Sequence, residues 1–245
     1  MDLRRRTLAL AALLVASSLV LRAQTAVDPS GHWSGSFQGP ETEVALEIDL
    51  AKNAKGEVVG TINFPAENVK GIPLRTVTLK GRSLTFSPRG DQSFTGEISA
   101  DGKAIAGEFK GIGPLGNEFA TPFTLNRAGA AKFAPAIKNA AIGKELLGTW
   151  HAFLESKSRG TTSRIVLTLA NNADGTANGK LTAPDEGGIE VPAGITQKGT
   201  NVTFDFGTVG ASYVGSLNAA GEIVGTFTQA GMNAPVTFRR GTGAK

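Results

Sequence analysis

Hydrophobic and polar residues alternate along most of the chain after residue 30. From Val44 to Leu50 every second residue is aliphatic, and Glu47 and Asp49 lie between them. A period of two puts successive side chains on opposite faces of an extended strand, with one face buried. Glycine turns such as Lys80-Gly81 and Asp101-Gly102 separate these runs. The pattern predicts short antiparallel strands and shows no convincing helical period.

This pattern occurs twice. The stretch from Gly31-His32-Trp33 to Arg127 recurs from Gly148-Thr149-Trp150 to Arg240, with nearly constant spacing between landmarks. Such long-period self-similarity marks a folding unit. Each repeat contains eight predicted strands: 31–38, 43–51, 56–64, 72–80, 82–88, 92–99, 103–110 and 118–127 in the first, and 148–155, 163–170, 175–183, 190–198, 200–206, 210–218, 221–228 and 234–240 in the second.

Eight short sequential strands favour an up-and-down barrel, whose closure leaves no exposed edge. The predicted fold is therefore all-β, with two tandem eight-stranded antiparallel up-and-down small barrels of the lipocalin or calycin kind. A pair of β-sandwiches is the alternative, because strand number does not separate the two. The predicted organisation is a signal peptide (1–26), a first barrel (27–128), a linker (129–147), a second barrel (148–241) and a tail (242–245). The alanine-rich linker is expected to form a helical turn or two before the second barrel.

The first residues differ from the rest. Arg4, Arg5 and Arg6 precede an apolar run from Thr7 to Leu21, which is short for a membrane span of roughly 18 to 20 residues. This arrangement predicts a secretory signal, with a retained N-terminal anchor as the alternative. The chain has no cysteine to carry a lipid. We therefore expect a periplasmic or secreted protein without stable membrane insertion after cleavage.

Charge adds little to this picture. The formal net charge is +4, but residues 27–245 hold 21 cations and 20 anions, about +1, interspersed along the strands. A clustered basic surface would indicate a nucleic-acid partner. Because the charges here are interspersed, no nucleic-acid partner is predicted. Without cysteine, stability must come from packing rather than from disulfides.

Loop length distinguishes the two ends of each predicted barrel. In both repeats the connections after the first, third, fifth and seventh strands are interpreted as the longer ones, and all open at one end. We call this end the mouth and the opposite end, where Trp33 lies, the floor. Variable loops on a constant scaffold commonly carry function. An eight-stranded barrel either holds one small ligand or is filled by side chains. The mouth loops of the first repeat are 38–42, 65–71, 87–92 and 111–119.

Five residues are candidates for ligand binding. Glu67 and Glu186 occupy equivalent positions in the loop after the third strand, and Asp185 adjoins the second of them. Carboxylates there suit a cation or a hydroxylated ligand, although solvated surface acids are the alternative. Trp33 and Trp150 begin the first strand of each repeat and either contact a ligand or plug the floor.

The sequence gives little support for catalysis. There is no cysteine nucleophile, His32 and His151 are not repeat-equivalent, and no Gly-x-Ser-x-Gly elbow is present. Metal-ligand spacings and phosphate-binding glycine loops are also lacking. We predict no catalytic residue, no metal and no cofactor. Hydrolysis by a carboxylate pair is the remaining enzymatic alternative.

Several segments carry a family resemblance, and the match is closer for the second repeat. The matching segments there are Gly148-x-Trp150, Pro184–Pro192, Ala211–Leu217, Ile223–Gln229 and Pro235–Arg240. With them the chain resembles, over both repeats, the small all-β domain that precedes secreted bacterial α/β-hydrolase or serine-hydrolase domains. That domain has no established catalytic residues to transfer. More distantly, Gly-x-Trp in the first strand is similar to the calycins, which include lipocalins, avidin-like proteins and periplasmic protease-inhibitor barrels.

Together these features predict an exported, non-catalytic binding protein. Each barrel would offer its mouth to a small apolar or saccharide-like ligand. The alternative partner is a protein, as for a periplasmic protease inhibitor or a hydrolase accessory module. A hydrolase is the third and least supported hypothesis.

Overall fold

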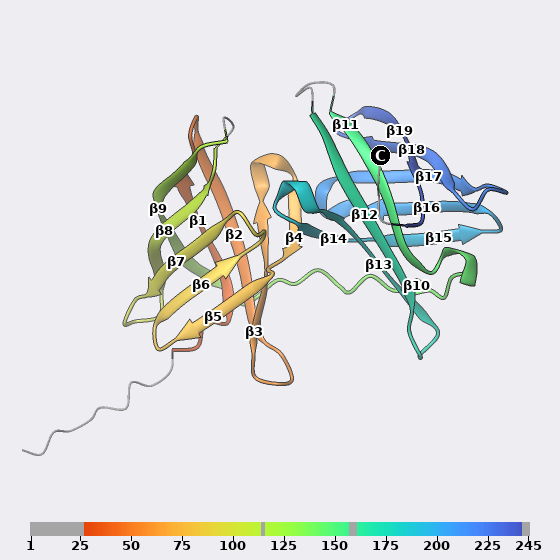
Figure 1. The fold of residues 1–245 in the computed structure, drawn as a ribbon. Helices are drawn as coiled ribbons and strands as arrows, with labels where there is room; N and C mark the ends of the chain where they lie inside the picture. The colour runs from red at the N-terminus through yellow and green to blue at the C-terminus, as the bar shows by residue number, and fades with distance from the viewer. Residues whose placement is uncertain (1–26, 114–115, 157–160, 242–245) are drawn as a thin grey trace, which may run out of the picture.

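The computed structural model describes residues 27–113, 116–156 and 161–241, which form two curled antiparallel β units joined by an extended segment (Figure 1). The predicted signal (1–26) and tail (242–245) lie outside the described residues. Every helix in the described part is a three-residue 3₁₀ helix, and none of them has the length or apolar character needed to cross a membrane. The expectation of an all-β protein is confirmed.

The first repeat forms one nine-stranded antiparallel sheet, in the order β4-β3-β2-β1-β9-β8-β7-β6-β5. Except for β4 and β5, strands that follow one another in sequence pair with each other, and β1 also pairs with β9. The sheet is therefore a curled meander in which the first and last strands meet. Its elements are β1 (Gly31–Gln38), β2 (Glu43–Lys52), β3 (Val58–Phe64), η1 (Pro65–Glu67), β4 (Val69–Pro73), β5 (Thr76–Lys80), β6 (Ser83–Ser87), β7 (Ser93–Ile98), β8 (Ala104–Ile112) and β9 (Glu118–Gly129).

The fourth predicted strand, 72–80, is divided into β4 and β5, because the backbone changes its hydrogen-bonding partner in the middle. The Leu74 N–H donates to Gly60 O on β3 over 2.9 Å, whereas the next amide, of Arg75, donates to Ser87 O on β6 over 2.8 Å. Residues 69–80 thus connect the two edges of the curled sheet. The side-chain alternation also shifts here: Ile72 and Leu74 face the core before the change and Val77 and Leu79 after it, with the exposed Arg75 and Thr76 between them.

The second repeat contains two five-stranded sheets. The first has the order β10-β13-β12-β11, and β14 also pairs with β13. The second has the order β15-β16-β17-β18-β19. His151 and Arg239 exchange backbone hydrogen bonds of 2.7 and 2.8 Å, which join β11 to the end of β19. The elements are β11 (Gly148–Ser156), β12 (Thr161–Asn171), β13 (Thr176–Ala183), η3 (Pro184–Glu186), β14 (Ile189–Pro192), β15 (Gly194–Lys198), β16 (Asn201–Phe206), η4 (Gly207–Val209), β17 (Ala211–Leu217), β18 (Ile223–Gln229) and β19 (Met232–Phe238).

The segment between the repeats attaches to the second unit through β10 (Asn139–Ala140) and η2 (Lys144–Leu146). The buried Asn139 amide donates to Ala177 O and Ala193 O over 3.2 and 3.0 Å, and its oxygen accepts the Ile195 N–H over 2.7 Å. Asn139 therefore links β13 to the start of β15. At this point the predicted fourth strand of the second repeat is also divided. η2 is the short helical turn expected before Gly148.

The floor of each unit has the same construction. Trp33 and Trp150 are fully buried, and their indole N–H groups donate to Pro29 O and Leu146 O over 2.9 and 2.8 Å. The guanidinium groups of Arg127 and Arg240 each lie 4.2 Å from the centroid of the tryptophan in their own unit. The same arginines donate to backbone carbonyl oxygens: Asp28, Ser30 and Gly102 for the first, and Glu145 and Leu147 for the second.

Candidate functional site: a cavity at the mouth of the first unit

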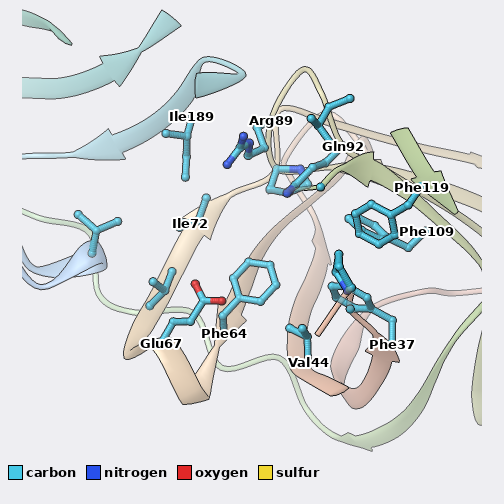
Figure 2. A pocket seen from close by; sticks show the side chains of 17 residues that line it. Phe37, Val44, Phe64, Glu67, Ile72, Arg89, Gln92, Phe109, Phe119 and Ile189 are labelled. Atoms are coloured by element: carbon cyan, nitrogen blue, oxygen red, sulfur yellow. The ribbon is translucent and has the colours of Figure 1, made fainter. Parts of the chain in front are cut away.

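A cavity of about 320 Å³ opens at the mouth of the first unit (Figure 2). All four mouth loops predicted from the first repeat contribute to it, which confirms that they gather at one end. The contributors from these loops are Gly39, Pro40, Glu67, Val69, Pro88, Arg89, Gln92, Ile112, Gly113 and Phe119. The other lining residues that come from the first unit are inward-facing residues of its strands.

The wall of the cavity is rich in aromatic rings. The ring centroids of Phe37 and Phe109 are 4.4 Å apart, and those of Phe109 and Phe119 are 5.5 Å apart in an edge-to-face arrangement. Phe64 and Ile72 line the side that faces the second unit. Because Phe37, Ile72 and Phe109 also belong to the buried core, these walls are set by packing and are preformed.

The second unit completes the cavity. Ile189 of β14 and Val209 of η4 line it and pack against the hydrophobic core of the first unit. Both come from mouth loops of the second repeat. The Gly187 carbonyl oxygen accepts the Gly90 N–H over 2.6 Å and the Arg75 Nη1 group over 3.2 Å. The two mouths thus meet, and the site is built from both repeats.

The packing at this contact requires a glycine at position 187. Its φ is +72°, and an ideal Cβ there would lie 2.1 Å from Asp91 Oδ1 and 2.9 Å from Arg89 Nε. A second contact runs the other way, since η4 packs against β4 and an ideal Cβ at Gly210 would lie 3.9 Å from Asn68 Nδ2. In both contacts the turn after the third strand of one repeat meets the turn after the fifth strand of the other.

Among the described residues, two charged ones line the cavity, and their surroundings differ. Arg89 forms a bidentate pair with Asp91, with Nε–Oδ1 and Nη2–Oδ2 distances of 2.7 and 2.6 Å. The hydrogen bonds from Arg89 hold the pKa of the Asp91 carboxyl below its ordinary value, against the opposing effect of burial. Glu67 is exposed and forms no hydrogen bond or ion pair with any described residue. The carboxylate of Glu67 is therefore the uncompensated charge of the cavity.

Of the five candidate residues, only Glu67 lines the cavity. Glu186 Oε1 accepts a 2.5 Å hydrogen bond from the Ser163 hydroxyl, and Asp185 Oδ2 accepts the Arg164 N–H over 2.9 Å. These two acids fasten η3 to β12. Trp33 and Trp150 lie at the floors and are absent from the cavity lining.

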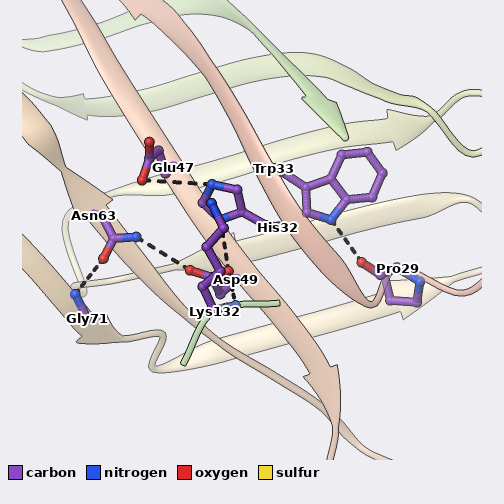
Figure 3. A network of polar contacts seen from close by, with 8 residues as sticks. All are labelled: Pro29, His32, Trp33, Glu47, Asp49, Asn63, Gly71 and Lys132. Carbon is purple, nitrogen blue, oxygen red and sulfur yellow. Dashed lines mark hydrogen bonds and ion pairs between the residues drawn. The ribbon is translucent and has the colours of Figure 1, made fainter. Parts of the chain in front are cut away.

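His32 belongs to a polar network on the outer face of the first sheet (Figure 3). Its Nδ1 lies 2.9 Å from Asp49 Oδ1, which also accepts the backbone N–H of Lys132 over 2.7 Å. The Asn63 side-chain nitrogen lies 3.5 Å from Asp49 Oδ2, and its side-chain oxygen accepts the Gly71 N–H over 2.6 Å. The network holds the start of the linker against the sheet.

The second histidine is placed differently. His151 lies on β11, and its buried Nδ1 has no hydrogen-bond partner in the described part of the chain. Neither histidine lines the cavity. Within residues 27–113, 116–156 and 161–241, no group of three or more His, Cys, Asp or Glu side chains is placed to hold a metal ion.

Sequence reasoning missed the contribution of the second unit. Ile189, Val209 and Gly187 are not among the sequence candidates, because the predicted fold gives each repeat a separate barrel with its own mouth. One signal is present: the loop after the third strand carries Gly187-Gly188 where the first repeat has Asn68-Val69. A glycine pair permits close approach of another backbone, but it does not say which one.

No protein-family model matches the sequence, and no curated protein matches it either. Among solved structures, the fold is similar to a DUF3598-family protein of unknown function from Nostoc punctiforme, with 14% identity, coverage of 86% of this chain and 96% of that one, and a TM-score of 0.30. It is also similar to the Pseudomonas aeruginosa MucA/MucB complex structure, with 10% identity, coverage of 88% and 90%, and a TM-score of 0.21. Neither similarity assigns a family or an activity.

Proposed function

We propose that this chain is an exported, non-catalytic binding protein whose first mouth takes a small, mainly apolar ligand. The observation that carries the proposal is the cavity of about 320 Å³, walled by phenylalanine and aliphatic side chains from both units. Small-molecule sites are typically concave, mostly apolar and roughly 300 to 1,000 Å³ in volume, with few polar groups. The export part of the proposal rests on the signal-like residues 1–26.

The proposal includes a closed barrel for each repeat. Its support is the partner change in the fourth strand, where the Leu74 and Arg75 amides bond to opposite edges of the first sheet. Ala193 donates to Gly179 O over 2.8 Å, and the next residue, Gly194, pairs with Asp205. A closed barrel with a plugged floor admits a ligand only at its mouth.

A homologous series of linear alcohols tests the proposal. Each buried methylene contributes about 0.8 kcal/mol, so the affinity measured by isothermal titration calorimetry should rise roughly fourfold per added carbon from 1-hexanol until the cavity is full. Val209→Asp places a charge in the lining and should weaken 1-octanol binding by at least about tenfold.

The matched control is Val224→Asp, which alters an exposed valine of the same unit away from the cavity. It should leave 1-octanol binding unchanged. Absence of alcohol binding to the unmodified chain, or equal losses in the two variants, would refute the proposed site.

A protein partner is the second candidate function. Val214 on β17 and Val224 on β18 are exposed and lie diagonally across neighbouring strands, since Val214 pairs with Thr226 and Ser216 with Val224. An exposed apolar pair on a regular sheet suits a protein contact. An accessory role beside a hydrolase, which the sequence resemblance implies, belongs here. Retention of an envelope protein by the unmodified chain and its loss in Val214→Asp would favour this function.

A further inference from the structure

We propose that the ligand of the first mouth is an amphiphilic cation, with an ammonium group paired to Glu67 and a hydrocarbon part among the phenylalanine rings. This inference rests on the proposed function and specifies the ligand class of the same site. It follows from the charges of the cavity, the position of Glu67 and the aromatic wall.

The charge balance of the lining favours a cation. Arg89 directs both Nε and Nη2 to Asp91 at 2.7 and 2.6 Å, so its charge is already compensated. Glu67 has no partner among the described residues. An anionic ligand would have to compete with Asp91 for Arg89 and would also face Glu67. A cationic ligand meets a free carboxylate without breaking any existing pair.

Glu67 is carried by a well-defined turn. Its 3₁₀ helix runs from Pro65 to Glu67 and is capped by Asn68, whose φ of 53° is left-handed and whose N–H donates to Pro65 O over 3.2 Å. The Asn63 side chain fixes the far side of the turn by accepting the Gly71 N–H over 2.6 Å. Figure 2 shows the Glu67 carboxylate directed toward the Phe64 ring, at the entrance to the aromatic wall.

The aromatic wall suits the same ligand class. An ammonium group within about 6 Å of a phenyl centroid is attracted to the negative face of the ring. Phe64 lies beside Glu67, so a cation there gains a ring face as well as a carboxylate, while its alkyl chain extends toward Phe109 and Phe119. The equivalent acid of the second repeat, Glu186, is bonded to Ser163 instead. The cation preference therefore belongs to the first mouth.

Three probes of equal chain length test the inference: octylammonium, 1-octanol and octanoate, titrated calorimetrically into the intact chain near neutral pH. A partly solvated ion pair is modest, so octylammonium should bind roughly threefold to tenfold more tightly than 1-octanol, and octanoate more weakly than both. Added salt should reduce the octylammonium advantage, that is, its higher affinity relative to 1-octanol, and should leave the affinity for 1-octanol unaffected.

Glu67→Gln should remove the octylammonium advantage while preserving 1-octanol affinity and the melting temperature. Glu186→Gln is the matched control and should retain the advantage. Equal binding of the cation and the alcohol, or an advantage that survives Glu67→Gln, would overturn the inference but leave the cavity as a binding site. Failure of all three probes would refute the proposed function itself.

Discussion

Replacing Gly187 with alanine should weaken the contact between the two units. The new Cβ would lie 2.1 Å from Asp91 Oδ1, so either Asp91 turns away from Arg89 or the η3 turn withdraws from Gly90 and Arg75. The first route loses a bidentate ion pair, and the second loses two hydrogen bonds, each contributing about 0.5 to 1.5 kcal/mol. A left-handed alanine adds roughly 1 kcal/mol. The expected loss of unfolding free energy is about 2 to 4 kcal/mol.

Gly188→Ala separates the clash from the backbone strain. Gly188 also has a positive φ, +65°, but the nearest atom to its ideal Cβ is Arg75 Nη1 at 3.4 Å. This control should lose only about 1 kcal/mol from backbone strain. Urea denaturation gives both values, and hydrogen exchange at the Gly90 amide reports whether its bond to Gly187 O survives.

A double-mutant cycle identifies the source of the difference. In an Asp91→Ala background the contact with Asp91 is absent, and Arg89, released from its ion pair, can turn away from the new Cβ. Gly187→Ala should then lose about as much stability as Gly188→Ala does. The expected coupling between Gly187 and Asp91 is about 1 kcal/mol or more. Equal losses for the two glycine variants, or the same loss for Gly187→Ala in both backgrounds, would refute the reasoning.

Two further predictions concern the floor and the response to acid. Arg127 donates to three carbonyl oxygens and Arg240 to two, so by urea denaturation Arg127→Ala should lose about 1 kcal/mol more than Arg240→Ala; equal losses would contradict the floor analysis. The folded pKa of Asp91 lies below its ordinary 3.8 because Arg89 donates to it, so its contribution is complete above that ordinary value and disappears as the pH falls through the lowered pKa. The unmodified chain should therefore lose more thermal stability below about pH 4 than Asp91→Asn does, and parallel melting curves would count against the ion pair.

Much of the architecture could be predicted from alternation and duplication. Inward positions such as Leu46 and Ile48 are buried, because a period of two fixes the face of a strand whatever its neighbour is. The longer loops of the first repeat do meet around one cavity. The division of strand 72–80 leaves one trace in the sequence, because the inward positions shift from Ile72 and Leu74 to Val77 and Leu79. That shift does not say that the two halves bond to opposite edges of the sheet.

The candidate site was only partly accessible to sequence reasoning. Glu67 and Glu186 are equivalent in sequence, yet one faces a cavity and the other bonds to Ser163. Which of two matched carboxylates is free depends on the neighbouring strand. Likewise, Ile189 and Val209 are ordinary aliphatic residues of two turns, and only the packing of one unit on the other makes them cavity walls.

The reciprocal contact between the mouths has a consequence for how the chain is assembled. Each repeat offers its third-strand turn to the fifth-strand turn of the other, so both use corresponding surfaces, as the partners in an isologous two-fold dimer do. The interface is therefore self-complementary at the level of a single repeat. The extended segment from residue 130 to 138 makes this pairing intramolecular and keeps the effective concentration of the partner high. Joining the halves also removes the requirement that they be identical: one copy can keep an open pocket with a free acid while the other supplies its cover.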